Sequence, residues 1–124
     1  MISEGNSSRE MLKTVLRVMG KKAAPGLAAL VIRSDLGART LQSKINRLIK
    51  TLNADKGILI LTELYGSTQS NVCADFIQKG QIEMISGYNL PLVLKAITLN
   101  KTATLAQVSR QACLAGKKYI KLFR

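Results

Sequence analysis

The sequence predicts an α/β domain built on a mostly parallel sheet, and two observations predict it. Segments with apolar residues spaced three and four apart alternate along the chain with short, continuous apolar runs. The spacing is typical of helices that bury one face, and the runs are typical of strands covered on both faces. Strands that alternate with helices imply parallel βαβ units with right-handed crossovers. At 124 residues the chain has the size of one domain, and we expect residues 1–124 to form it.

The first half of the chain is predicted to form two helices separated by a strand. Apolar residues recur at helical spacing over Met11–Met19, with Ser7 or Ser8 as the candidate N-cap and Gly20 as the stop. A polar turn then leads to an apolar run, which is followed by a second segment of helical spacing. We therefore expect a strand over Leu27–Ile32 and a helix over Ala38–Leu52.

The second half contains the clearest strand. Gly57–Thr62 is apolar without alternation, which predicts a position at the centre of the sheet. The polar segment Tyr65–Asn71 is predicted to be a loop, and Pro91 suits the first turn of a helix. The other predicted elements are a helix over Val72–Lys79, a strand over Gln81–Ser86, a helix over Pro91–Thr98 and a last helix over Thr104–Lys118.

The composition excludes several kinds of chemistry. The sequence contains no histidine, so histidine general-base catalysis, histidine phosphotransfer and histidine-ligated metal sites are excluded, and we expect neither a metal nor a cofactor. Cys73 and Cys113 lie outside any Cys-x-x-Cys spacing, which favours buried free thiols in a reducing compartment. The N-terminus does not resemble a signal peptide, and the apolar runs are too short to cross a bilayer, so we expect a cytoplasmic protein.

The net charge is strongly positive. Lys and Arg number 19 and Asp and Glu number 7, giving a formal charge of +12, which indicates an acidic partner such as nucleic acid or an anionic surface. Few aromatic residues are present to stack on bases, and no DNA-reading module is visible. The cations lie at spacings that would place them on solvated helix faces, namely Arg9, Lys13 and Arg17, then Lys44, Arg47 and Lys50, with Lys117, Lys118, Lys121 and Arg124 at the C-terminus.

The segment after the central strand is the first candidate site, because ligands bind at the carboxyl ends of parallel strands. In Glu63-Leu-Tyr-Gly-Ser-Thr-Gln-Ser-Asn71, Gly66 permits unusual backbone angles and several hydroxyl and amide side chains precede the next helix. Free N–H groups at the start of that helix would form an anion cradle. The same residue types also form ordinary capped loops, and the spacing does not distinguish the two interpretations.

Two blocks of sequence carry a family resemblance. Gly57-Ile-Leu-Ile-Leu-Thr-Glu-Leu-Tyr-Gly-Ser-Thr-Gln-Ser-Asn71 followed by Ile85-Ser-Gly-Tyr-Asn-Leu-Pro91 resembles the mannose-family enzyme IIA of the bacterial phosphoenolpyruvate-dependent sugar phosphotransferase system. The resemblance extends from about Gly5 to Ile120. It implies a three-layer α/β/α fold with a four-stranded sheet in the order 2-1-3-4, and dimers that exchange a C-terminal strand. It also implies two partners, the histidine-phosphorylated carrier protein and enzyme IIB.

The resemblance places the family's phosphate site on particular residues of this chain. The family's phosphoacceptor histidine, in a Thr/Ser-His-Gly pattern, aligns with Glu4, which is followed by Gly5. The supporting Asp of the family aligns with Glu63, and the phosphate loop keeps Gly66. The remainder of the degenerate phosphate or partner site is then Ser67, Thr68 and Asn71.

These departures indicate a protein without phosphotransfer activity. A glutamate does not hold a phosphoryl group as a histidine does, although carboxyl phosphates form on aspartates elsewhere. Glu4 is then either the product of drift after the loss of catalysis or a fixed negative charge that imitates the phosphorylated state. The pair Glu4 and Glu63 would bring like charges together, an arrangement also used in acid–base hydrolysis, but no second feature supports a hydrolase.

The family's first strand is longer than the one available here, since only Met1 and Ile2 precede Ser3. Either the first strand is unusually short or the true N-terminus lies upstream of Met1. A third hypothesis follows from the second case: phosphotransfer is active, and the phosphoacceptor histidine is missing from this sequence. The leading hypothesis is an enzyme IIA-like, regulatory or partner-binding component of the phosphotransferase system. The alternative is a basic protein that binds nucleic acid or an anionic surface on the same scaffold.

Overall fold

A parallel sheet organises the computed structural model, which describes residues 1–33, 35–52 and 54–124. Four strands lie in the order β2-β1-β3-β4, with all neighbours parallel. This order and the α/β class confirm the prediction, and the strand Gly57–Thr62 is central as expected. The strands are β1 (Ile2–Glu4), β2 (Leu30–Ile32), β3 (Ile58–Thr62) and β4 (Ile82–Ser86).

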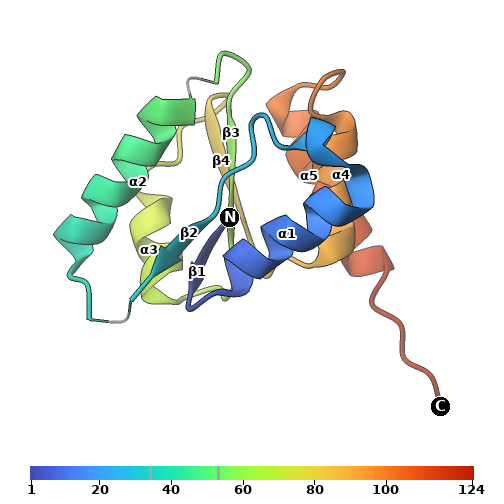
Figure 1. Ribbon diagram of the computed structural model, residues 1–124, viewed down its shortest axis with the longest axis horizontal. Helices are drawn as coiled ribbons and strands as arrows, with labels where there is room; N and C mark the ends of the chain where they lie inside the picture. The colour runs from blue at the N-terminus through green and yellow to red at the C-terminus, as the bar shows by residue number, and fades with distance from the viewer. Residues whose placement is uncertain (34, 53) are drawn as a thin grey trace.

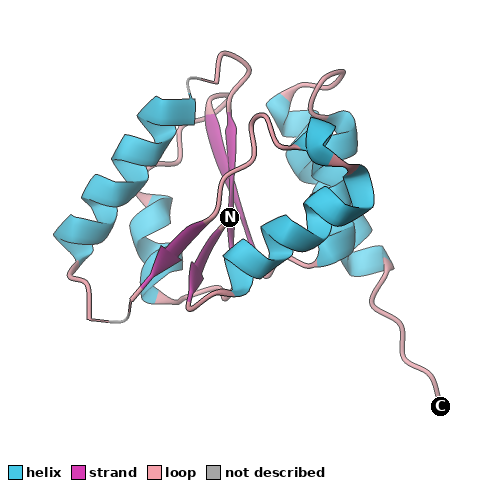
Figure 2. Ribbon diagram, in the orientation of Figure 1, coloured by secondary structure: helices cyan, strands magenta, loops and turns pink. Residues whose placement is uncertain are grey.

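Helices cover both faces of the sheet and complete three layers (Figures 1 and 2). The helices α2 and α3 lie on one face, and α1, α4 and α5 lie on the other (Figure 1). Their bounds are α1 (Ser7–Met19), α2 (Ala38–Leu52), α3 (Thr68–Ala74), α4 (Leu90–Leu99) and α5 (Leu105–Lys118), with a short 3₁₀ turn η1 (Lys21–Ala23) after α1.

The apolar residues of the strands point alternately into two cores, one for each face of the sheet. In β3, Ile60 belongs to the core beneath α2 and Leu61 to the core beneath α4, because successive strand residues face opposite sides. The first core is closed by residues such as Leu41 and Ile45 of α2, which are almost fully buried. This pattern explains why the strands are continuously apolar.

The predicted strand Leu27–Ile32 is too long at its start. In the structure β2 begins at Leu30, whose position is opposite Ile2 in β1. Because β1 begins at Ile2, the residues before Leu30 have no strand beside them with which to form a ladder. The apolar pattern correctly indicates a strand here, but its length depends on how many residues of β1 lie beside it to form backbone hydrogen bonds.

The predicted helix Val72–Lys79 is wrong in both bounds. The helix α3 covers Thr68–Ala74, so the predicted loop Tyr65–Asn71 is partly helical. Ser67 causes the early start, since its hydroxyl accepts a hydrogen bond from the N–H of Ser70 at 3.2 Å. The polar side chains that suggested a loop therefore belong to a helix and its cap.

The predicted N-cap of the first helix is also wrong, although Gly20 does end that helix, with a φ of 82°. Ser7 and Ser8 lie inside α1, and Asn6 occupies the N-cap position without a side-chain hydrogen bond. Both serine hydroxyls have other partners: Ser7 donates to Glu63, and Ser8 donates to the carbonyl of Leu30. Thr104, predicted as the first residue of the last helix, is instead its N-cap.

The basic residues of the first two helices lie on exposed faces, as their spacing predicts. The exposed residues are Arg9, Lys13 and Arg17 on α1, and Lys44, Arg47 and Lys50 on α2. Within the part of the chain that the structure describes, no helix combines the length and apolar character needed to cross a membrane.

Candidate functional site

The candidate site lies where the strands end. Glu4 is the last residue of β1, and Glu63 directly follows β3. Because the sheet is parallel, the carboxyl ends of these strands meet at one edge, the lower edge in Figure 1. The structure therefore brings together the residues that the sequence placed in a site from positions far apart in the chain.

Glu63 joins the end of β3 to the segment after β1. Its carboxylate accepts a hydrogen bond from the backbone N–H of Glu4, with a donor–acceptor distance of 3.2 Å, and another from the hydroxyl of Ser7. Glu63 is exposed at this edge, so its charge remains in contact with solvent. The carboxylate fixes the turn that carries Glu4 and Gly5, which has a φ of 74°.

The side chain of Glu4 takes a different partner. Its carboxylate accepts a hydrogen bond from the amide of Gln69 in α3, at 3.4 Å. Glu4 also lines a cavity of about 140 Å³ together with Arg33, Ser67 and Thr68. The cavity combines a carboxylate, a guanidinium and two hydroxyls, so its walls are suited to a polar ligand or to a polar side chain of another protein.

The loop after Glu63 is an ordinary helix cap. Gly66 has a φ of 80°, a conformation that favours glycine, and Ser67 then caps α3. The N–H of Asn71 donates to the carbonyl of Ser67 at 2.9 Å, inside the first turn. Its side-chain amide lies 3.5 Å from the carbonyl of Gly66, so Asn71 closes the loop. Of the two interpretations of this segment, the hydrogen bonds support the capped loop.

Two buried serines, Ser3 and Ser8, connect β1 to α1 beside the candidate site. The Ser3 hydroxyl accepts a hydrogen bond from the N–H of Ser8 at 2.9 Å, and its oxygen lies 2.7 Å from that of Ser8. Ser3 and Ser8 are only 1% and 0% exposed, so these polar groups are satisfied inside the protein. They attach the start of α1 to β1 and so determine where Ser7 and Glu4 lie.

The segment Gly87–Pro91 borders the same edge from β4. The N–H of Gly87 donates to the carbonyl of Thr62 at 2.8 Å, and Asn89 caps α4 by accepting from the N–H of Leu92 at 3.1 Å. The amide of Asn89 also donates to the carbonyl of Gly116 in α5, at 3.0 Å. This segment therefore connects the site edge to the start of α4 and the end of α5.

Tyr88 lies in the segment that borders this edge. Its hydroxyl oxygen is buried and has no hydrogen-bond partner among the described residues. Burial raises the pKa of Tyr88 above its usual value of 10.0, the nearby Ser7 hydroxyl lowers it, and the negative charge of Glu63 raises it further. Tyr88 is therefore a neutral, buried hydroxyl at physiological pH.

Sequence reasoning missed Ser7, Arg33 and Gln69 as site residues. Arg33 follows directly after β2, and its position at the carboxyl end of a strand is a signal that would have identified it as a candidate site residue. Gln69 lay within the polar segment but carried no signal that distinguished it from its neighbours. Within the described residues, no group of three or more Cys, Asp and Glu side chains gathers as a metal site would require.

Comparison with known proteins agrees with this architecture. Among solved structures, the mannose/sorbose-specific IIA subunit of the phosphotransferase system from Enterococcus faecalis superposes with a TM-score of 0.86 at 19% identity, covering 99% of this chain and 91% of that one. The phosphotransferase system component EIIA from Streptococcus agalactiae gives a TM-score of 0.79 at 19% identity, covering 98% and 93%. At these identities the structural likeness shows the fold alone.

Sequence comparison adds the family. The fructose-specific EIIA component of the PTS system from Bacillus subtilis (strain 168) is 31% identical over 88 residues, covering 62% of this chain and 60% of that protein. The mannose-specific EIIAB component from Escherichia coli (strain K12) is 26% identical over 96 residues, covering 77% of this chain and 29% of that protein. The chain thus spans only part of the length of both relatives. The model of the family described as PTS system fructose IIA component matches residues 3–113, and this chain belongs to that family, the mannose-family IIA proteins of the phosphotransferase system.

Proposed function

We propose that this protein is a IIA-like component of the sugar phosphotransferase system that binds partner proteins without carrying a phosphoryl group itself. The observation that carries the proposal is the match of residues 3–113 to the family in a sequence that contains no histidine. A phosphohistidine intermediate requires an imidazole nitrogen, which this chain does not supply. The partners proposed from the resemblance are the histidine-phosphorylated carrier protein and enzyme IIB.

The environment of Glu4 supports a role as a permanent charge. The resemblance aligns Glu4, the last residue of β1, with the family's phosphoacceptor, and its carboxylate accepts a hydrogen bond from the amide of Gln69. Glu4 is exposed, so its charge is accessible to another protein at the cavity that it shares with Ser67 and Thr68. A partner that recognises an anionic group at this place would meet a carboxylate where related proteins present a phosphoryl group.

Phosphoryl transfer is the first test. The protein is incubated with labelled phosphoenolpyruvate, enzyme I and the carrier protein, beside a histidine-containing mannose-family IIA protein as positive control. We expect label on the control and none on this chain. Incorporation of label into this chain, at any residue, would contradict the proposal.

Partner binding is the second test, measured by titration calorimetry with the unphosphorylated carrier protein and with enzyme IIB. We expect saturable binding to at least one of them. Glu4→Gln, which removes the charge and keeps the shape, should weaken that binding. Glu10→Gln is the matched control, because Glu10 is also exposed, lies on α1 outside the cavity, and pairs with Lys13 at 2.7 Å. Absence of binding to both proteins, or equal effects of both variants, would refute a partner site at Glu4.

A further inference from the structure

Residues 117–124 form a segment that is both basic and apolar. The helix α5 ends at Lys118, and the chain beyond it extends away from the other elements (Figure 1). Four large apolar side chains of the segment are between 65% and 89% exposed, namely Tyr119, Ile120, Leu122 and Phe123. Its four cations are exposed as well, namely Lys117, Lys118, Lys121 and Arg124. We call residues 117–124 the basic-apolar segment.

The basic-apolar segment lies in a part of the chain that has no acidic side chains. All seven Asp and Glu residues of the sequence lie within residues 4–83, whereas residues 84–124 contain seven Lys and Arg. Among the described residues, the two ion pairs join Lys13 to Glu10 and Arg33 to Asp35, both far from this segment in the sequence. The charge of the segment is therefore suited to an anionic partner.

A helical period separates the cations of the segment from its apolar side chains. The buried stripe of α5 follows steps of three and four residues through Leu105, Val108, Ala112 and Gly116. The same steps continue to Tyr119 and Phe123. The cations at positions 117, 121 and 124 also recur at steps of four and three, and they fall on the opposite side of the helix. Continued as a helix, the segment would have one apolar face and one basic face.

A strand period would mix the two kinds of side chain. Tyr119, Lys121 and Phe123 would share one side of a strand, and the residues between them would share the other side with Arg124. Either side would then carry a cation into an apolar contact, which is costly. The segment contains neither Gly nor Pro, so its composition permits the helix that its pattern favours.

The helix nevertheless ends at Lys118 in the structure. The N–H of Tyr119 donates to the carbonyl of Ala115 at 3.2 Å, but the N–H of Ile120 donates to Lys117, only three residues back, at 3.3 Å. The last turn therefore tightens as α5 ends. Helices in proteins are stabilised mainly by packing of their apolar face, and residues 119–123 are exposed. An apolar surface beneath these residues would supply the packing that a longer helix requires.

We propose that the basic-apolar segment binds the surface of an anionic lipid bilayer, where residues 119–124 continue α5 as an amphipathic helix. The four apolar side chains enter the boundary between headgroups and acyl chains. The four cations remain at the level of the headgroups and contact the negative charges of the lipids. Tyr119 suits this boundary because it combines an apolar ring with a polar hydroxyl.

Two other partners fit the segment less well. A second copy that docked symmetrically through the same segment would bring the cations of both copies together, and each chain has a formal charge of +12. Nucleic acid would neutralise the cations but leave Ile120 and Leu122 without a contact, because bases stack on aromatic side chains. A bilayer accommodates both the cations and the aliphatic side chains.

Binding to lipid vesicles tests the proposal. The protein is titrated with vesicles of phosphatidylcholine alone and with vesicles that contain about one third phosphatidylserine. We expect saturable binding to the anionic vesicles and none to the neutral ones. A cation at the membrane surface contributes about fivefold to such binding. Replacing Lys118, Lys121 and Arg124 together by Gln should therefore weaken binding by about a hundredfold.

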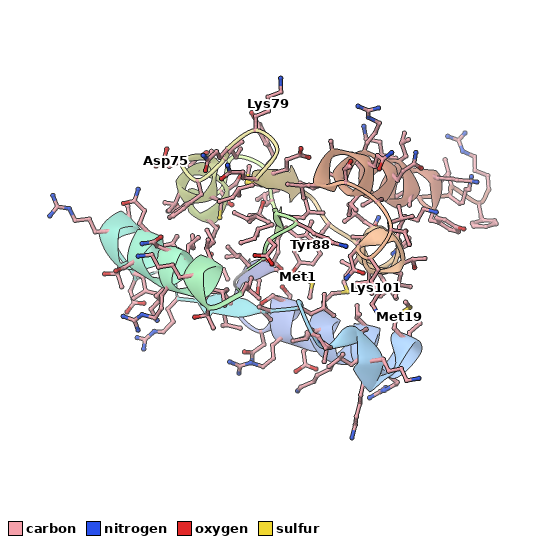
Figure 3. All side chains as sticks on the ribbon, turned by 90° about the horizontal axis from the view of Figure 1, so that it is seen from above. Met1, Met19, Asp75, Lys79, Tyr88 and Lys101 are labelled. Atoms are coloured by element: carbon pink, nitrogen blue, oxygen red, sulfur yellow. The ribbon has the colours of Figure 1, made fainter. Side chains whose placement is uncertain are left out.

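Two matched controls separate the segment from the overall charge of the protein. The exposed cations Lys44, Arg47 and Lys50 lie on α2, at the opposite side of the molecule from α5 (Figures 1 and 3). Replacing these three by Gln removes the same charge and should change binding by less than about threefold, since distant charges are screened. Ile120→Ser should weaken binding about tenfold, whereas Ile77→Ser, at an isoleucine that is also exposed, should leave it unchanged.

Backbone hydrogen exchange tests the helix itself. With anionic vesicles, the N–H groups of residues 121–124 should exchange about tenfold more slowly or less, because a continued helix pairs them with carbonyls four residues back. Equal binding to both kinds of vesicle, equal losses in either matched pair of variants, or binding without this protection would overturn the proposal. So would binding of a DNA duplex through the same cations without binding to vesicles, or a dimer formed through the segment in extended conformation.

Discussion

The buried amine of Met1 predicts how the stability of the 124-residue chain depends on pH. The pKa of this amine is lowered from 8.0 to about 6 by burial, so between these values the unfolded chain binds more protons than the folded one. Stability is therefore highest above about pH 8 and falls as the pH decreases toward 6. A separation of about two pH units corresponds to about 2–3 kcal/mol of unfolding free energy.

Few other groups titrate between pH 6 and 8 in this chain, so a change of stability in this range can be assigned to the Met1 amine. The sequence contains no histidine, so the side chain that usually titrates between pH 6 and 8 is absent. Burial raises the pKa of Cys73 from 9.0 to about 11, so the loss of stability from ionisation of this thiol in the unfolded chain begins only above the window. Urea denaturation at constant ionic strength, in steps from pH 6 to 8, measures the effect.

Acetylation of the amine is the control, because it removes the charge and leaves an N–H to donate to Ala28. The acetylated chain should show a flat stability curve over the same range. A flat curve for the chain with the free amine, or stability that increases as the pH falls, would refute the assignment of a desolvated amine at this position.

Three further predictions concern Gly57, the N-cap of α5 and the thiol of Cys73. Gly57→Ala should lower the free energy of unfolding by about 2–4 kcal/mol in urea denaturation, because the φ of Gly57 is +101° and a Cβ there would lie 2.9 Å from Leu105. Gly37→Ala is the control: a Cβ at Gly37 has nothing within 4 Å, so its unfolding free energy should stay within about 0.5 kcal/mol of the parent, and equal losses in both variants would contradict the prediction. Thr104→Ala removes the capping box of α5 and should reduce the unfolding free energy by about 1 kcal/mol, and an unchanged value would argue against the cap. Cys73, whose side chain is 0% exposed, should react with iodoacetamide at pH 8 at least roughly 100-fold more slowly in the folded protein than in urea, as judged by mass spectrometry; comparable rates would contradict its raised pKa.

Much of the fold was predictable because apolar spacing records which faces are buried. The helix α2 has the predicted bounds Ala38–Leu52, and its apolar stripe faces the core, with Leu41 and Ile45 almost fully buried. The start of β2 was not predictable from its own residues, because it depends on where β1 begins on the neighbouring strand. The start of α3 was missed because serine, the residue type of the N-cap Ser67, is equally common in loops.

The candidate site was predictable in location and less so in detail. Parallel strands bring Glu4 and Glu63 to one edge whatever the loops do. The hydrogen-bond partners of these two carboxylates depend on the three-dimensional arrangement, which the spacing of residues along the chain does not predict. Glu63 accepts from the backbone N–H of Glu4, while the Glu4 carboxylate accepts from Gln69, so the two carboxylates have separate partners.

The link between Asn89 and Gly116 has a practical consequence for any labelled form of the protein. Because that hydrogen bond holds the end of α5 beside the start of α4, the exposed residues 119–124 leave the fold near the carboxyl ends of the strands (Figure 1). An affinity tag fused after Arg124 would extend away from β1, on the side of α1, α4 and α5 (Figure 1), and would leave the strand end that carries Glu4 accessible to a binding partner.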